Sequence, residues 1–328
     1  MASAAAASTQ PGRLRAGVVV PAVIFGILVL LPAGALTTSH DYLLDLFTRV
    51  MIFSIAACAL DLLLGYGALV TFGQAAFIGL GAYAVGILAS HGIDEALIAL
   101  PAALAVTALF ALVTGIVCLR TTGVYFIMIT LAFGQMTFFT ASALAPYGGD
   151  DGLTIASRNT VAGMPLMDSP LSFYYVALAC LLGTFLLCRT LVISRFGRVL
   201  RGAKENPVRM TTLGFEVYRF QLVAYVIAGM ISGLAGFLLA NATEFVSPAY
   251  MSWQRSGELI IMVLLGGMGT LYGAIIGAAA YLLTEEWLSG ITTDWKVIFG
   301  PVLVLIVVFA RGGLVGAAAE IARRWRRD

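Results

Sequence analysis

Long apolar runs separated by short polar breaks extend along the chain from about residue 17. A transmembrane helix needs about 20 apolar residues, because the hydrocarbon core is about 30 Å thick and a helix rises 1.5 Å per residue. The pattern therefore predicts an all-α polytopic membrane protein with about ten spans. They are expected at roughly 17–36, 43–65, 66–90, 96–119, 123–145, 171–191, 219–241, 256–275, 276–290 and 296–311. The last two are short and follow glycine-rich breaks, so half-helices or re-entrant segments are alternatives to full crossings there.

Two terminal tails flank the apolar region. Residues 1–16 are of low complexity and are expected to be disordered, 17–311 to form one transmembrane domain with a long inner loop at 192–218, and 312–328 to form a basic cytoplasmic tail. Arginines before the first apolar run and Ala33-Gly34-Ala35 at its end also resemble a signal peptide. We favour an uncleaved first span, because a multi-spanning chain needs a segment that starts insertion.

The composition excludes an ordinary soluble domain. Hydrophobic residues make up 60% of the chain and charged residues 11%, whereas about a quarter of the residues of a soluble domain are charged. Such a chain could not cover itself with polar surface in water. Glycine accounts for 36 of the 328 residues, as expected where helices pack closely in lipid.

Charge sidedness gives an orientation, because lysine and arginine mark the cytoplasmic side of a membrane protein. With the N-terminus inside and ten crossings, only four of the 19 basic residues fall on the outer side. They are Arg49, Arg158, Arg255 and Lys296. Most acidic residues, Glu258 and Glu285 among them, fall there as well. Both termini are therefore expected in the cytoplasm, and a net charge of +2 gives no reason to expect nucleic-acid binding.

The sequence offers no catalytic arrangement. No GxxxxGK[ST] phosphate-binding loop occurs, and the only lysines are Lys204 and Lys296. The histidines, His40 and His91, fall at outer ends of spans, so no metal site or proton relay is expected. The longest outer loop, at about 146–170, is too short for a solute-binding domain. We expect no enzymatic activity, metal or cofactor in this chain.

Asp61 is the one clear ionisable residue inside a predicted span, about one turn from its cytoplasmic end. Ion-coupled carriers place such groups inside the bilayer. A carboxylate so close to the interface can also reach water or a helix N-terminus. We favour this structural role over that of a functional intramembrane charge.

Glycine-rich breaks interrupt two apolar runs. In the first, Gly65 weakens the helix, and Thr71 and Gln74 bring polar groups into the run. Non-helical backbone at membrane depth is tolerated only where protein or a water-filled cavity covers it, which makes this segment a candidate wall of a translocation path. Close helix packing is the alternative. A similar break follows in the other half of the chain, and paired breaks point to a translocation site. The candidate path residues are Gly65, Thr71, Gly73, Gln74, Gly79, Gly81, Gln135, Gly266, Gly267 and Gly269.

The inner loop 192–218 contains helix-end signals on both sides of a short segment. Asn206 and Pro207 suit the N-cap and the first position of a helix, and Gly214 suits a C-cap. The sequence therefore predicts a helix over 207–213 that lies parallel to the membrane. A capped helix in this place suits the transmission of force from a soluble partner.

Four segments resemble a known family over roughly residues 45–315. They are FGQAAFIGLGAY, LRTTGVYFIMITLAFGQM, SRFGRVLRGAKENPVRMTTLGF and VLLGGMGTLYGAIIGAA. In order and spacing they look like the LivM-type permeases of branched-chain amino acid ABC importers. The resemblance implies a prokaryotic inner-membrane permease that pairs with a second, LivH-type permease. It also implies two cytoplasmic ATPases, which would bind ATP and Mg, and a periplasmic or lipid-anchored solute-binding protein.

By the same resemblance, the helix around Pro207 is a coupling helix that sits in a groove of the ATPase. The candidate coupling residues are Arg198, Arg201, Lys204, Glu205, Asn206, Pro207 and Gly214. Two positions depart from the family, since Asp61 stands where Asn is common and Gln135 where Glu is common. Relatives that import urea, short amides or aromatic acids share these segments, so the exact solute stays open. A self-sufficient secondary transporter is the alternative from another class.

Overall fold

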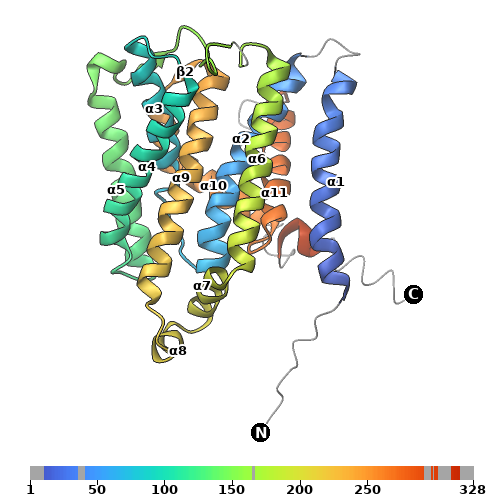
Figure 1. Ribbon diagram of the computed structural model, residues 1–328, viewed down its shortest axis with the longest axis vertical. Helices are drawn as coiled ribbons and strands as arrows, with labels where there is room; N and C mark the ends of the chain where they lie inside the picture. Colours follow the sequence, from blue (N-terminus) through green and yellow to red (C-terminus); the bar gives the residue numbers. More distant parts are fainter. Residues whose placement is uncertain are drawn as a thin grey trace.

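The structure is a computed structural model that describes residues 11–35, 41–164, 167–291, 297, 299–301 and 312–317. Most of this chain is helical, and the long helices run side by side in one bundle (Figure 1). In chain order the elements are α1 (Pro11–Ala35), α2 (Asp41–Asp61), the π-helix η1 (Leu62–Tyr66), α3 (Gln74–Ser90), α4 (Ala96–Cys118), α5 (Val124–Ala143), the 3₁₀ helix η2 (Ala145–Tyr147), β1 (Leu153–Thr154), α6 (Pro170–Ile193), α7 (Arg195–Glu205), α8 (Pro207–Thr212), α9 (Val217–Thr243), β2 (Phe245–Val246), the 3₁₀ helix η3 (Pro248–Met251), α10 (Trp253–Gly266) and α11 (Leu271–Ser289).

Five stretches of the described chain are long and apolar enough to cross a membrane. They are Tyr42–Tyr66, Ala96–Cys118, Val124–Ala143, Pro170–Ile193 and Val217–Thr243. The bent pair of α10 and α11 makes a sixth if it counts as one span. The multi-pass helical fold is therefore as expected, while the number ten stays a prediction. Most of the predicted span 296–311 lies outside the described residues.

Several predicted boundaries are wrong. The span expected at 66–90 is a helix of 17 residues, α3, which a non-helical segment separates from η1. The division expected between 275 and 276 lies instead at 267–270, where the axis bends by 116° from α10 to α11. Glycines with positive φ terminate helices there, and hydrophobicity alone does not mark that position. In addition, residues 11–16 belong to α1, and 313–317 are helical, whereas 1–10 and 318–328 lie outside the described residues.

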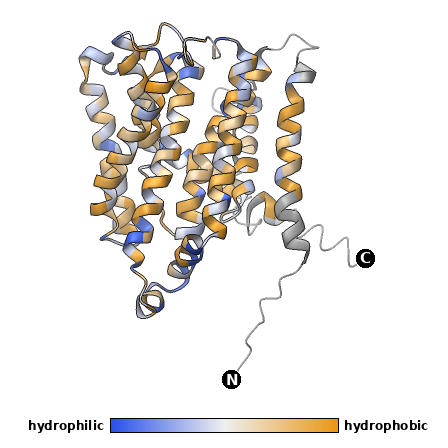
Figure 2. Cartoon of the chain, viewed as in Figure 1, coloured by the Kyte–Doolittle hydropathy of each residue, from blue (hydrophilic) through white to orange (hydrophobic). Residues whose placement is uncertain are grey.

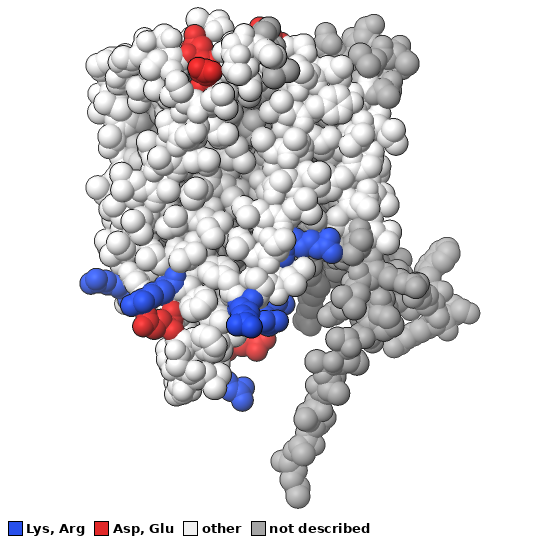
Figure 3. All heavy atoms as spheres, viewed as in Figure 1, with Lys and Arg blue, Asp and Glu red and all other residues white. Residues whose placement is uncertain are grey.

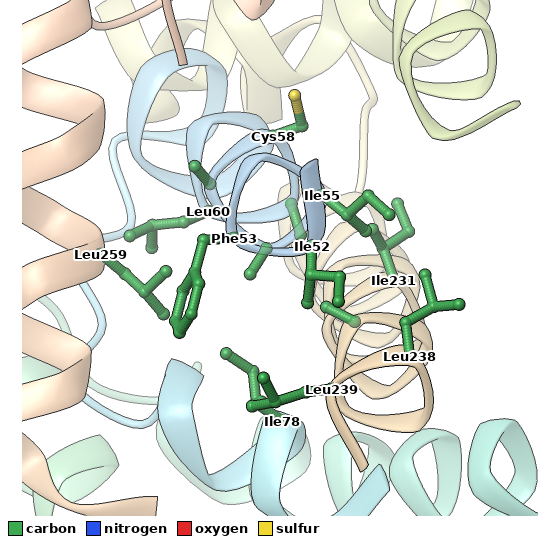
Figure 4. Packing of buried hydrophobic residues seen from close by; sticks show 14 of the residues in the cluster. Ile52, Phe53, Ile55, Cys58, Leu60, Ile78, Ile231, Leu238, Leu239 and Leu259 are labelled. Atoms are coloured by element: carbon green, nitrogen blue, oxygen red, sulfur yellow. The ribbon is translucent and has the colours of Figure 1, made fainter. Parts of the chain in front are cut away.

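The core of the bundle forms around α2 and α9. Ile52 and Ile55 of α2 face Ile231 of α9 in the close view (Figure 4). By contrast, α4 and α5 expose most of their apolar side chains, and apolar residues cover the length of the bundle (Figure 2). Lipid is as apolar as these side chains, so packing rather than hydrophobic burial must hold the helices together.

Small residues permit that packing. A Cβ on Gly81 of α3 would collide with the carbonyl of Gly233 in α9, and a Cβ on Gly236 with the carbonyl of Ile78. The helices α3 and α9 therefore cross with their backbones in contact. Gly277 of α11 lies equally close to the backbone of α10.

The two ends of the bundle differ in charge. On the face shown in Figure 3, Lys and Arg gather toward the end that carries α7 and α8, together with a few acidic side chains. The opposite end shows acidic side chains on this face. There, β1 and β2 pair antiparallel, and Arg158 forms an ion pair with Glu244 at 3.1 Å. These contacts fasten the 146–170 loop to the end of α9.

Candidate functional site

The two glycine-rich breaks meet in the folded chain. The backbone N–H of Gly269 donates a hydrogen bond of 2.7 Å to Oδ1 of Asp61. A Cβ on Gly65 would collide with this carboxylate and with the backbone of Gly269. Segments about 200 residues apart in the sequence thus close on each other where α2 ends and α10 turns into α11.

Local geometry explains why each break is rich in glycine. The helix α2 passes into the π-helical turn η1, a conformation that is frequent at functional sites. The chain then reverses, and the N–H of Leu69 bonds back to the carbonyl of Leu63 at 3.0 Å. In the second break, Gly267 and Gly269 have φ values of +120° and +76°, which other residues rarely adopt.

Asp61 is fully buried, and its described partner is the backbone of Gly269. A buried carboxylate that accepts a backbone N–H satisfies a donor which the turn between α10 and α11 leaves open. This arrangement favours the structural role considered for Asp61. Nothing in the sequence indicated that its partner would come from the other break.

Residues 71–73 are non-helical and lead into Gln74, the first residue of α3, and both Thr71 and Gln74 are fully buried. Oγ1 of Thr71 accepts from the N–H of Gly73 at 3.1 Å, and Gly73 packs against the backbone of Thr130 in α5. Nε2 of Gln74 donates to Oγ of Ser232 in α9 at 2.6 Å. All three predicted residues are therefore buried between helices, as the packing alternative requires.

The first turns of α3 and α10 also lie together. The N–H of Ala75 donates to Oγ of Ser256 at 3.1 Å. Both helices therefore begin within the bundle, next to the covered segment. Half-helices that begin at membrane depth are typical of transport proteins.

Other candidate path residues have packing roles. Gly79 lies against Met251, and Gly81 lies against Gly233, as described above. Gly266 packs on the backbone of Gly273 at the start of α11. Gln135 is half-buried on α5, and its Nε2 has no hydrogen-bond partner among the described residues. The structure does not bring Gln135 to the point where the breaks meet.

The inner loop folds as two helices, of which the sequence predicted one. The helix expected over 207–213 is present as α8, with Leu213 as its cap. Oδ1 of Asn206 accepts from the N–H of Arg209 at 2.9 Å, and Gly214 adopts φ +87° after the helix. Both helix-end predictions are therefore confirmed. The missed helix α7 is amphipathic and could have been found from its apolar residues three and four apart, Phe196, Val199, Leu200 and Ala203, between basic ones.

One hydrogen bond joins this loop to the first break. Nζ of Lys204, in the last turn of α7, donates to the carbonyl of Gly65 at 2.7 Å. Nη2 of Arg201 donates to the carbonyl of Val192 at the end of α6 at 2.9 Å. A displacement of α7 would therefore act on the backbone next to Asp61.

The α8 end of the inner loop exposes apolar side chains. Val208 and Leu213 of the α8 turn are 69% and 65% exposed. Met210, by contrast, packs onto Gly202 and holds α8 against α7. Exposed apolar side chains on a capped helix outside the bundle are a feature of protein-binding surfaces.

Four charged residues expected on the outer side come together from three helices. Arg49 of α2 pairs with Glu285 of α11 at 3.8 Å, and Arg255 pairs with Glu258 within α10 at 2.7 Å. Both arginines approach the ring of Phe53. Their place on the outer side stays a prediction.

Several apolar spans, two facing breaks and a helical loop linked to one of them define a multi-pass helical transport protein. The chain matches, over residues 42–309, the family described as the branched-chain amino acid transport system permease component. It belongs to this family and is a LivM-type permease of the inner membrane.

Similar proteins of known name are also permease subunits. The chain is 24% identical to the LivM permease protein of a high-affinity branched-chain amino acid transport system in Salmonella typhimurium, over 83% of this chain and 69% of the relative. It is 28% identical to the autoinducer 2 import permease LsrC of an Enterobacter species, over 80% of this chain and 74% of that one. A probable LivH permease of Methanocaldococcus jannaschii is 33% identical over 42% of this chain and 43% of its own length. No solved structure matches the chain.

Proposed function

We propose that this chain is one of two related permease subunits of an ATP-driven importer, and that it carries branched-chain amino acids inward. The observation that carries the proposal is the hydrogen bond from Lys204 to Gly65. It gives a loop outside the bundle direct contact with the covered break inside it. The LivM relatives, which belong to branched-chain amino acid transport systems, support this class of solute.

The proposed mechanism uses the loop as a lever. Cytoplasmic ATPases would bind the exposed turn around Val208 and Leu213 and move α7 and α8 as a unit. Lys204 would pass this movement to Gly65, where the π-helical turn and the two breaks can change their packing. Bistable packing of this kind can convert a small shift at one end into the opening of a path.

The remaining subunits are part of the same proposal. A second, LivH-type permease would complete the path, and a solute-binding protein would deliver the amino acid from outside. ATP and Mg would bind to the ATPase subunits. The similarity to LivH proteins over part of the chain supports a pair of related permeases.

Substitutions that uncouple ATP hydrolysis from uptake test this mechanism. In the assembled complex, Lys204→Met removes the bond to Gly65, and Val208→Gly with Thr211→Gly weakens α8 by about 0.3–0.5 kcal/mol per glycine. We expect ATP hydrolysis to continue while uptake falls by about tenfold or more, a coupling loss of about 1.4 kcal/mol. Parallel assays of ATPase activity and uptake in proteoliposomes measure both.

Glu216→Gln is the matched control. Glu216 lies in the same loop, and its exposed ion pair with Arg219 contributes little to stability. Normal coupling in the Lys204 and α8 variants would rule out the lever. Glu205→Gln belongs in the same series, since Glu205 is exposed at the end of α7 and is a candidate ATPase contact.

The second candidate function is import of a different solute by the same class of transporter. The similarity to an autoinducer 2 import permease extends over 80% of this chain, and relatives for urea, amides or aromatic acids were expected from the sequence. A thermal-shift screen of the partner binding protein with these compounds and with leucine, isoleucine and valine distinguishes the solutes.

A further inference from the structure

A short turn near the end of the chain lies against the second break, residues 267–270. We call residues 312–317 the C-terminal turn, and within it the N–H of Gly316 donates to the carbonyl of Gly312 at 3.1 Å. Gly313 is buried, and Leu314 packs against the apolar core. The C-terminal turn is therefore packed onto the bundle.

The contact between this turn and the second break is made by backbone alone. A Cβ on Gly313 would lie 2.6 Å from the nitrogen of Gly267 and 2.7 Å from the carbonyl oxygen of Leu265. From the other side, a Cβ on Gly267 would lie 2.5 Å from the carbonyl oxygen of Gly312. Side chains do not keep such distances, so the contact requires glycine at both positions.

Backbone conformation makes the same demand. The φ values are +120° at Gly267, +114° at Gly312 and +69° at Gly313, and glycine adopts them without the clash that a Cβ brings. The two segments thus approach each other where both have glycine-specific backbone. A contact that needs three glycines at once is specific to these positions.

The second break is held from two sides. On one side Gly269 donates to Asp61 of α2 at 2.7 Å, and on the other Gly267 lies against the C-terminal turn. Because these backbone atoms touch, Gly267 cannot move toward the C-terminal turn without displacing it. Closely packed segments of this kind change between discrete arrangements rather than deform continuously. A change in the packing of the breaks therefore involves the C-terminal turn.

We propose that the C-terminal turn is an autoinhibitory clamp on the second break. While it is seated, the two breaks keep the packing seen here, and it separates from the second break when the ATPase subunits drive that packing to change. This inference rests on the proposed function. It adds an element that restrains transport and that belongs to a different part of the chain from the inner loop.

Hydrogen–deuterium exchange of the assembled complex follows the clamp directly. The reporter amides are those of Gly269, which is bonded to Asp61, and Gly316, which is bonded within the C-terminal turn. Exchange is compared without nucleotide and after trapping with ATP and vanadate. We expect segments 265–270 and 312–317 to exchange faster together on trapping, by at least about tenfold, because local opening exposes both amides. Any other pattern would overturn the clamp.

A single methyl group should weaken the clamp. Gly313→Ala places a Cβ onto the backbone of the second break. Gly92→Ala is the matched control, since Gly92 has a similar φ of +75° but a Cβ there meets nothing within 4 Å. Without nucleotide, we expect Gly313→Ala to speed exchange at 265–270 by at least about tenfold and Gly92→Ala to leave it unchanged. Equal exchange in the two variants would contradict the clamp.

ATP hydrolysis without solute should also rise in Gly313→Ala, by about threefold or more, because loss of a restraint on one state shifts the population toward the other. If this variant does not assemble, the comparison of nucleotide states decides alone, since it needs no substitution. The proposed function is judged separately, by ATP-driven leucine uptake of the unsubstituted complex in proteoliposomes. Uptake without joint exchange of the two segments would sink the clamp alone, and joint exchange without uptake would sink the proposed function alone.

Discussion

Asp61 joins two breaks of the chain through a single hydrogen bond to Gly269. Its burial would be unfavourable without that donor, because a buried carboxylate must be hydrogen-bonded. Gly65 is required beside it, since any side chain there would displace either the carboxylate or the second break. Asp61, Gly65 and Gly269 therefore hold the two glycine-rich breaks together.

Substitution of Asp61 separates its two possible roles. Asp61→Asn keeps an oxygen acceptor for Gly269, so we expect normal assembly and uptake. Asp61→Leu leaves the N–H of Gly269 without an acceptor and should destabilise the chain by about 1–3 kcal/mol. Thermal unfolding of the solubilised complex and uptake in proteoliposomes measure the two effects. A stable Asp61→Asn complex that does not transport would show that the charge itself is functional.

At the scale of elements, helix pairs are held by backbone contact between small residues. The crossing of α3 and α9 depends on Gly81 and Gly236, which lie on neighbouring backbone atoms. Of the two, Gly81 was a candidate for a path wall in the sequence, and the structure places it against the backbone of Gly233.

A single methyl group tests the crossing. Gly236→Ala introduces a Cβ onto the carbonyl of Ile78 and should destabilise the chain by about 1–3 kcal/mol, since the helices must separate. Gly183→Ala is the matched control, because a Cβ on Gly183 in α6 meets nothing within 4 Å. It should be neutral or stabilising by up to about 1 kcal/mol. Equal thermal stability of the two variants would contradict the close crossing.

At the scale of the whole molecule, the proposed importer takes its energy from separate ATPase subunits. The sequence contains no GxxxxGK[ST] phosphate-binding loop, which supports this part of the proposal.

The chain alone is therefore expected to be inactive. In liposomes with a proton or sodium gradient, its leucine uptake should equal that of protein-free liposomes. The complete complex with its binding protein and internal ATP should transport. Gradient-driven uptake by the isolated chain would favour the secondary transporter instead.

The sequence determined the features that depend on neighbouring residues. Apolar runs predicted the membrane helices, and Asn206, Pro207 and Gly214 predicted α8, because residues that cap a helix act within one turn. The paired glycine breaks were also visible as a local pattern. Family resemblance added the class of protein, which the comparison over residues 42–309 confirmed.

Only the tertiary structure decided which of these features meet. The bond from Asp61 to Gly269, the bond from Lys204 to Gly65 and the ion pair of Arg49 with Glu285 all join residues far apart in the chain. Such contacts depend on where the helices bend and how closely their backbones approach. Hydrophobicity does not encode either property, because a glycine at a bend and a glycine in a straight helix are equally apolar.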